Sequence, residues 1–139
     1  KHNTIIIGTS TTLRALISKH NLLGRESFPV VGVFDTNRVN VGENLDGYII
    51  KDLKDLKDLL KETTVDIAIV ELFKNEVKSV VNELIDNGVK EILNISDTDL
   101  RYASDVHIEN INISDALLRL SFHASERKRE EAGDLSEDM

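Results

Sequence analysis

Hydrophobic residues in this sequence gather in short, nearly continuous runs instead of alternating with polar residues. Five such runs cover residues 3–7, 29–34, 65–70, 91–95 and 106–111. Alternation is typical of a strand with one solvated face, whereas continuous runs are typical of parallel strands covered on both faces. The pattern therefore predicts a buried parallel sheet.

Helical spacing of apolar residues separates these runs. It covers residues 13–17 after the first run, residues 53–60 before the third and residues 75–87 after the third. Asp52 is placed to cap the second of these helices, and Gly88 stands where the third would have its C-terminal cap. Strands and helices that alternate at these lengths predict a Rossmann-like α/β fold, with a doubly wound parallel sheet in three layers.

The C-terminal part of the chain has a different pattern. Ser114 can cap a helix whose apolar residues spread more widely than one stripe. These residues are Ala116, Leu117, Leu118, Leu120, Phe122 and Ala124. A helix that is apolar on more than one side needs a second covering surface, and a partner subunit is the natural one. We therefore expect a Rossmann-like domain at residues 1–112, a dimerisation helix at 113–126 and a charged, flexible tail at 127–139.

Composition narrows the classes of protein. The 139 residues suit one domain. Cysteine is absent, which excludes disulfides and thiolate metal sites and suits a cytoplasmic location. The net charge of −8 argues against nucleic-acid binding by this segment itself. No apolar run approaches the roughly 20 residues that a membrane span needs, so we expect no membrane association.

The first strand leads into a turn that is typical of nucleotide binding. It ends at Gly8, hydroxyl-bearing residues follow, and a helix begins, so unpaired N–H groups would be available for a phosphate. The dinucleotide fingerprint is G-x-G-x-x-G, but the chain reads G-T-S-T-T-L and keeps only the first glycine. The hydroxyls could bind a phosphate or simply cap the helix. They belong to Thr9, Ser10, Thr11 and Thr12.

Two acidic residues follow strands at the edge of the sheet where ligands bind. Asp35 ends the second strand, somewhat further beyond Gly8 than the usual spacing of about 20 residues. It could accept hydrogen bonds from a ribose, which favours NAD or an adenosine ligand over NADP, or it could be a solvated turn residue. Glu71 follows the third long strand, where a carboxylate would repel a pyrophosphate. It could instead bind a cation or a hydroxyl-rich ligand, or be a solvated acid.

Catalytic and metal-binding patterns are missing from the sequence. The histidines lack the spacing of a metal site, and no G-x-S-x-G motif offers a nucleophile. We therefore expect no metal, no catalytic residues and no enzymatic activity. The histidines are His2, His20, His107 and His123.

Several segments together carry a resemblance to a known family. They are Ile5–Gly8, Arg14–Leu16, Val33–Asp35, Val41–Gly42, Asp52–Leu53, Ile67–Ile69, Gly88–Asn94, Asn110–Ile113 and Leu120–Phe122. In order and spacing they resemble the C-terminal, dinucleotide-sensing domain of the Rex family of bacterial redox-sensing repressors, over roughly residues 3 to 123. The stretch Gly88–Asn94 carries the most specific part of the resemblance.

The resemblance implies a function as well as a fold. Rex proteins are homodimers whose N-terminal winged helix binds DNA, and whose Rossmann domain binds NADH or NAD and controls operator release. Their C-terminal helix is swapped into the partner subunit. A winged helix is not among these residues, so DNA binding would need a segment outside them. The implied cofactor-binding residues are Gly8, Thr9, Ser10, Thr11, Thr12, Asp35, Val70, Glu71, Leu72 and Asn94.

The departures from the family pattern fall on the ligand. The second and third fingerprint glycines of the family align with Ser10 and Leu13, and its Thr-Val-Pro aligns with Glu71–Phe73. Its basic residue beyond Asp35 aligns with Asn40. We therefore expect NAD(H) binding that is weakened or lost.

Two alternatives stay open at this point. One is a ligand-free dimerisation module. The other is the N-terminal Rossmann domain of a sugar-nucleotide-modifying enzyme, which resembles residues 30–35 and 46–48. That alternative explains Gly88–Asn94 and the terminal helix less well.

Overall fold

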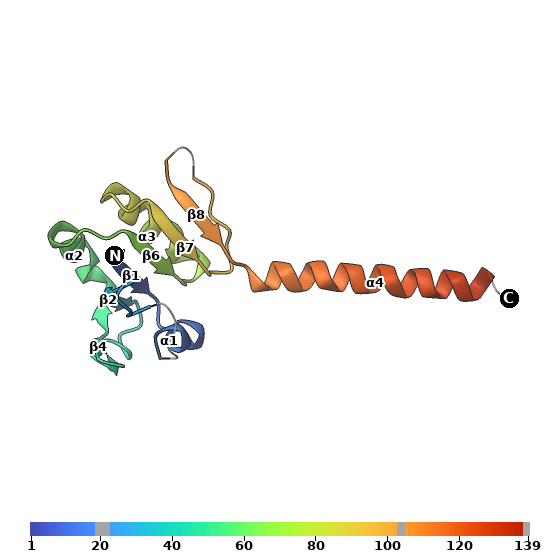
Figure 1. Ribbon diagram of the computed structural model, residues 1–139, viewed down its shortest axis with the longest axis horizontal. Coiled ribbons are helices and arrows are strands. Elements are labelled where there is room, and N and C mark those ends of the chain that lie inside the picture. Colours follow the sequence, from blue (N-terminus) through green and yellow to red (C-terminus); the bar gives the residue numbers. More distant parts are fainter. Residues whose placement is uncertain (19–22, 103–104, 138–139) are drawn as a thin grey trace.

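The protein is built around one six-stranded sheet whose neighbouring strands are all parallel (Figure 1). The computed structural model describes residues 1–18, 23–102 and 105–137, so His20 and the last two residues of the expected tail lie outside the described part. In spatial order the strands are β5 (Lys51–Asp52), β2 (Val30–Asp35), β1 (Thr4–Ile7), β6 (Ile67–Val70), β7 (Glu91–Asn94) and β8 (His107–Asn110).

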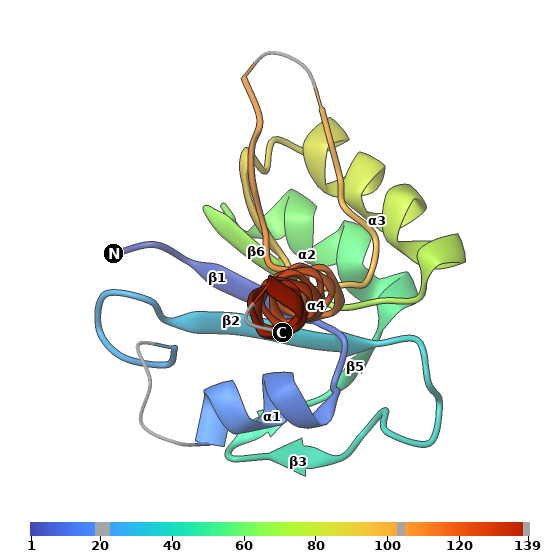
Figure 2. The same ribbon diagram turned by 90° about the vertical axis from the view of Figure 1, so that its right-hand side faces the viewer.

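Helices cover the two faces unequally. In Figure 2, α2 (Leu56–Glu62) and α3 (Lys74–Asp86) lie on one face and α1 (Thr11–Ser18) lies on the other. A short 3₁₀ helix, η1 (Leu53–Asp55), precedes α2, and the Asp52 side chain accepts a hydrogen bond from the Lys54 amide as the expected cap. This three-layer arrangement confirms the predicted Rossmann-like fold.

A small hairpin sits apart from the main sheet. It consists of β3 (Asn44–Leu45) and β4 (Tyr48–Ile49), which pair antiparallel. The Asn44 side chain accepts a hydrogen bond from the Gly47 amide at 2.7 Å, which closes the turn between the two strands.

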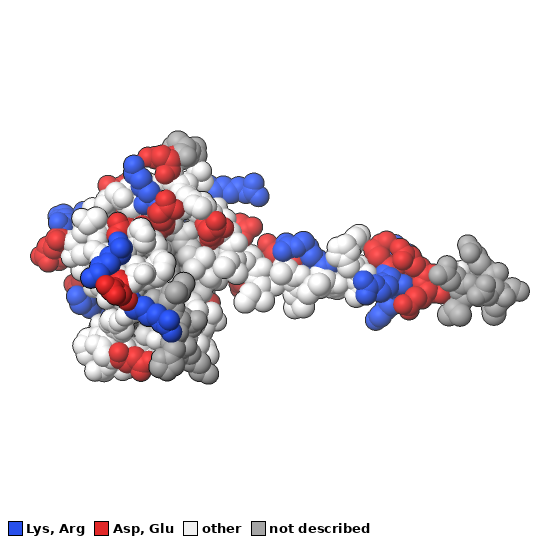
Figure 3. All heavy atoms as spheres, viewed as in Figure 1, with Lys and Arg blue, Asp and Glu red and all other residues white. Residues whose placement is uncertain are grey.

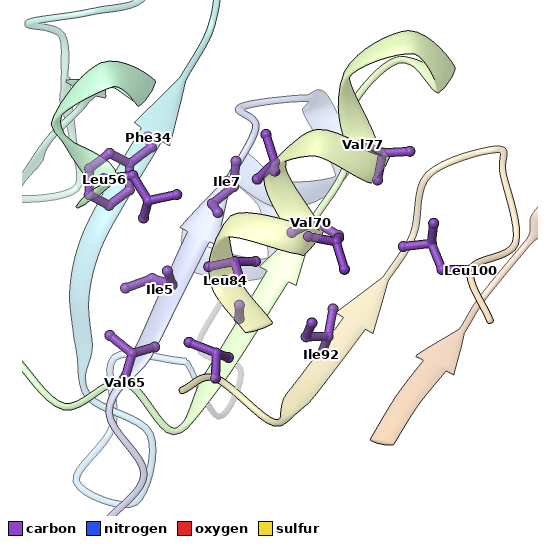
Figure 4. Close-up of a cluster of buried hydrophobic side chains, with 14 residues drawn as sticks. Ile5, Ile7, Phe34, Leu56, Val65, Val70, Val77, Leu84, Ile92 and Leu100 are labelled. Carbon is purple, nitrogen blue, oxygen red and sulfur yellow. The ribbon is translucent and has the colours of Figure 1, made fainter. Parts of the chain in front are cut away.

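The core explains why the strands read as continuous hydrophobic runs. Successive residues of a strand point to opposite faces, so Ile5 and Ile7 join the cluster beneath α2 and α3 while Ile6 joins the cluster beneath α1. Figure 4 shows the first cluster, in which Phe34 and Leu56 pack beside the strands and Leu84 reaches down from α3. Both faces are covered, so most strand positions are apolar, and the buried polar residues Thr4, Asp35 and Asn94 are hydrogen-bonded.

The end of α3 confirms the predicted role of Gly88. Its φ is +92°, a conformation that favours glycine, and its amide donates to the Ile85 carbonyl at 3.0 Å. The Val89 amide donates to the Leu84 carbonyl at 3.0 Å. These two bonds are the Schellman motif, which stops the helix and directs the chain into β7.

The C-terminal helix differs from the expectation in two ways. It begins at Ile113 and is capped by Asn112, whose side chain accepts from the Asp115 amide at 3.1 Å, so Ser114 is not the cap. It also continues to Glu137, so the predicted tail from residue 127 is helical as far as it is described. Glutamate, lysine, arginine and alanine are strong helix formers, and Arg129 pairs with Glu126 at 3.1 Å one turn away.

This helix, α4 (Ile113–Glu137), projects away from the sheet (Figure 1). Its first half carries the exposed apolar residues and few charges, and charged residues gather further along it, as Figure 3 shows. Large apolar side chains stand in solvent with 62–72% of their surface exposed. They are Ile113, Leu117, Leu118, Leu120 and Phe122. In the described residues no helix is both long enough and apolar enough to cross a membrane.

Candidate functional site

A cleft of about 570 Å³ opens where the carboxyl ends of β1, β2, β6 and β7 meet. The chain leaves β1 for one face of the sheet and β6 for the other, so the cleft lies at the switch point where doubly wound sheets bind ligands. Its lining residues come from the segments that follow these four strands. They are Gly8, Thr9, Ser10, Asp35, Thr36, Asn37, Asn40, Glu71, Leu72, Phe73, Lys74, Ile95, Ser96 and Asp97.

Gly8 is required by the close approach of two strand ends. Its φ is +107°, and a Cβ atom placed there would lie 2.3 Å from the carbonyl oxygen of Glu71. The Gly8 amide also donates to the Phe34 carbonyl at 2.8 Å, which continues the pairing of β1 with β2. The surviving fingerprint glycine therefore holds the floor of the cleft.

Ser10 caps α1, as one of the two sequence interpretations predicts. Its side-chain oxygen accepts from the Leu13 amide at 3.2 Å, and its carbonyl accepts from the Arg14 amide at 2.9 Å. Its hydroxyl also donates to the Glu71 carboxylate, a contact that the sequence does not reveal. Thr11 and Thr12 are exposed on the first turn of α1 and do not line the cleft.

Asp35 is a buried, hydrogen-bonded carboxylate and not a solvated turn residue. Only 7% of its surface is exposed. One carboxylate oxygen accepts from the Thr9 hydroxyl and, at 2.9 Å, from the Asn40 side-chain amide; the other accepts from the Asn37 backbone amide at 3.1 Å. Burial alone would raise the pKa of Asp35, but these donated hydrogen bonds outweigh it and hold the pKa below its ordinary value.

Arg14 braces the loop that carries the hydroxyls. Its Nε donates to the Thr9 carbonyl at 2.8 Å, and its two terminal nitrogens donate to the Glu43 carboxylate at 2.7 and 3.0 Å. The planar guanidinium thus ties the turn after β1 to the loop before the small hairpin. The hydrogen bonds to Glu43 raise the pKa of Arg14, and those from Arg14 lower the pKa of Glu43.

Asn94 and Val70 support the cleft from below and do not line it. The Asn94 side-chain nitrogen donates to the Thr98 carbonyl at 2.7 Å and to Asn110 Oδ1 at 2.9 Å, and its oxygen accepts from the Ser96 amide at 3.0 Å. Ser96 in turn accepts from the Leu72 amide at 2.9 Å. Val70 is fully buried among apolar side chains.

Several lining residues were not singled out from the sequence as ligand contacts. Asn37 and Asn40 follow β2, Lys74 begins α3, and residues 95–97 follow β7. The sequence could have indicated these residues, because they follow predicted strands. Every segment that leaves the carboxyl end of a parallel strand reaches this edge of the sheet. That Asn40 donates to both Thr9 and Asp35 depends on the folded loop, which the sequence pattern does not specify.

The cleft suits one half of a dinucleotide better than the other. Asp35, with Thr9, Asn37 and Asn40 around it, offers the carboxylate and polar groups that bind ribose hydroxyls. Glu71 and Ser10 occupy the place of the pyrophosphate cradle, and a carboxylate there repels phosphate. The residues present therefore fit the nucleoside half and do not fit the pyrophosphate half.

No metal-binding arrangement is found among the described side chains. In that part of the chain no group of three or more His, Cys, Asp and Glu residues could hold a metal ion. His107 lies between Glu91 and Glu109, with ring nitrogens 3.2 and 2.9 Å from their carboxylates, on a different part of the sheet from the cleft.

Comparison with known proteins places this geometry in a wider group. Residues 1–98 match the family model described as CoA binding domain. A redox-sensing transcriptional repressor Rex from Clostridium perfringens (strain SM101) is 32% identical over 121 residues, which are 87% of this chain and 57% of that protein. The chain thus spans little more than half the length of this curated relative.

Solved structures give the same picture. The structure of RSP in complex with β-NAD⁺ and operator DNA is 26% identical, with a TM-score of 0.82 over 94% of this chain and 60% of that one. The structure of RSP in complex with β-NADH is 27% identical, with a TM-score of 0.78 over 94% of this chain and 63% of that one. RSP is described as a Rex-family repressor.

These similarities confirm the resemblance to Rex, because they cover 87% and 94% of the chain and so include part of the terminal helix as well as the sheet. They do not favour the sugar-nucleotide-modifying alternative, which leaves that helix unexplained. The chain belongs to the family of CoA binding domains, and it shares most of its length with Rex redox-sensing repressors.

Proposed function

We propose that this chain is the sensor and dimerisation domain of a Rex-like redox-sensing transcriptional repressor. It responds to the balance of NADH and NAD, catalyses no reaction and acts in the cytoplasm. The observation that carries the proposal is the cleft at the switch point of the sheet, with Gly8 at its floor and the hydrogen-bonded Asp35 carboxylate at its ribose side. Relatives that share this fold are described as redox-sensing repressors.

The ligand that we propose is NAD(H), bound more weakly than by a site with an intact glycine loop. The proposed contacts are the residues named from the sequence that line the cleft. They are Gly8, Thr9, Ser10, Asp35, Glu71 and Leu72. Two titrations of the purified chain, one with NADH and one with NAD⁺, test this by fluorescence or calorimetry. We expect saturable binding that Asp35→Ala abolishes. If neither NADH nor NAD⁺ bound up to millimolar concentration, the chain would be a dimerisation module only.

The partner that we propose is a second copy of the chain, bound through residues 113–126. The exposed apolar side chains of α4 support this, because soluble proteins rarely leave such a stripe in water. A swapped helix would cover them on the partner, and a winged helix elsewhere in the parent protein would bind DNA. Sedimentation of the purified chain checks the dimer, and a monomer at all concentrations would contradict it.

A further inference from the structure

Glu71 reaches the N-terminus of α1, the place where dinucleotide-binding folds hold a pyrophosphate. The Ser10 hydroxyl donates to its carboxylate while the Ser10 oxygen accepts from the Leu13 amide, so the carboxylate is held at the N-terminus of α1. Unpaired amides and the helix dipole make this end of a helix a favourable place for an anion. The Glu71 carboxylate is therefore an anion of the protein itself that already lies at the N-terminus of α1.

The backbone of Glu71 is held in place by neighbouring segments. The Glu71 amide donates to the Ile7 carbonyl at 3.0 Å, its carbonyl lies against Gly8, and the next amide, that of Leu72, donates to Ser96. These bonds fix the Cα of Glu71 at the wall of the cleft, from which its half-buried side chain reaches Ser10.

The other charged residues of the cleft do not neutralise the negative charge of Glu71. Asp35 and Asp97 line the cleft together with Glu71, and among the described lining residues Lys74 is the single cation. Asp35 accepts hydrogen bonds from Thr9, Asn37 and Asn40, which are uncharged. Arg14 also interacts electrostatically with Asp35, but its guanidinium is already paired with Glu43. A pyrophosphate would therefore enter a cleft with an excess of negative charge.

We propose that Glu71 is an internal substitute for a ligand phosphate and selects against phosphate at the N-terminus of α1. The ligand class that the cleft prefers is then an adenosine-type nucleoside whose substituent at this position is neutral or cationic. Ser10 is the positioning residue that holds the carboxylate. The inference rests on the proposed nucleotide site and deepens it, because it adds a specific carboxylate to the altered glycine loop as a cause of weak dinucleotide binding.

A ladder of ligands with increasing negative charge tests the proposal. Adenosine, AMP and ADP are titrated into the wild type, Glu71→Gln, Glu71→Ala and the control Asp97→Asn, which removes an exposed acid of the same cleft. Each variant is first checked for a native thermal transition. Glu71→Gln keeps a partner for Ser10 and removes only the charge, so it separates repulsion from loss of folding.

In the wild type we expect affinity to fall from adenosine to ADP. Both Glu71 variants should bind ADP roughly tenfold more tightly or better, with adenosine changed by less than about twofold, because only the phosphates meet the carboxylate. Asp97→Asn should gain much less. Raising the ionic strength should strengthen ADP binding to the wild type by screening the repulsion, and this effect should shrink in Glu71→Gln.

The outcomes separate this inference from the proposed function. Equal ADP affinity in the wild type and both Glu71 variants, or equal gains from Asp97→Asn, would overturn the selection by Glu71. If the Glu71 variants gain ADP affinity but neither they nor the wild type bind NADH, the sensing of NAD(H) is wrong and the selection stands. If the wild type binds NADH at low micromolar concentration and Glu71→Ala binds it no better, the selection by Glu71 is wrong and the sensing of NAD(H) stands.

Discussion

The hydroxyl of Thr9, in the turn after β1, donates a hydrogen bond to the carboxylate of Asp35, the last residue of β2. The two residues are 26 positions apart in the chain, and the parallel pairing of their strands brings them together. The bond helps to keep the pKa of Asp35 below its ordinary value of 3.8 despite burial. Asp35 is thus a structural carboxylate as well as the candidate ribose contact.

Asp35→Asn should destabilise the fold in a pH-dependent manner. A lowered pKa in the folded state means that the ionised form adds stability at neutral pH, and that this stability is lost as pH falls through the folded pKa. We expect a cost of about 1–3 kcal/mol at pH 7 that shrinks below about pH 4. Urea unfolding of both proteins at several pH values measures it, and a difference that does not change with pH would contradict the lowered pKa.

Gly8→Ala should cost clearly more stability than Gly42→Ala. Both glycines have positive φ, +107° and +90°, but a Cβ at Gly8 would lie 2.3 Å from the Glu71 carbonyl while nothing lies within 4 Å of one at Gly42. We expect about 1 kcal/mol for Gly42→Ala, from backbone strain alone, and at least twice that for Gly8→Ala. Chemical denaturation of the two variants gives the comparison. Equal losses would mean that the strand ends can move apart.

Asn94→Ala should lower stability and leave nucleoside binding intact. The change removes the partners of the Thr98 carbonyl, Asn110 Oδ1 and the Ser96 amide inside the fold. We expect a loss of about 2–3 kcal/mol. Asn82→Ala, which removes only an exposed acceptor of the Tyr102 hydroxyl, should stay within about 0.5 kcal/mol. A stable Asn94→Ala protein that no longer binds adenosine would instead make Asn94 a ligand contact.

The dimer that we propose should depend on the apolar half of α4. Leu117 and Leu120 are one turn apart with 65% and 67% of their surfaces exposed, so replacing both by Asp removes apolar contact area without touching the core. We expect the doubly substituted chain to sediment as a monomer with an unchanged sheet. A chain that ends at residue 126 should remain a dimer. If the doubly substituted chain stayed a dimer and the chain that ends at residue 126 became a monomer, the charged half of the helix would be the part that associates.

The sheet could be predicted from the sequence because its strands are buried on both faces. Continuous apolar runs, the helical spacing between them and Gly88 are all local patterns, and the structure confirms each of them. The extension of α4 was missed because a charged segment has no apolar stripe, although its residues are good helix formers. Asn112 was missed as a cap because Ser114 is an equally good capping residue two positions later.

The chemistry of the cleft could be predicted only in part. Asp35 and Glu71 were found because they follow strands, and their positions at one edge of the sheet are correct. Their partners were not found, because Ser10 and Glu71 are 61 residues apart and meet only after strand register is set. Asn94 was taken as a ligand contact, although its polar atoms are used inside the fold.

The two edge strands of the sheet influence whether this domain aggregates at high concentration. An outer strand with free backbone groups can recruit a strand from another molecule and start aggregation. At one end β5 has only two residues, too few to guide a foreign strand. At the other end β8 carries the exposed His107 and Glu109, whose polar side chains discourage further pairing. The edges of the sheet are thereby protected from pairing with strands of other molecules, although α4 leaves large apolar side chains exposed.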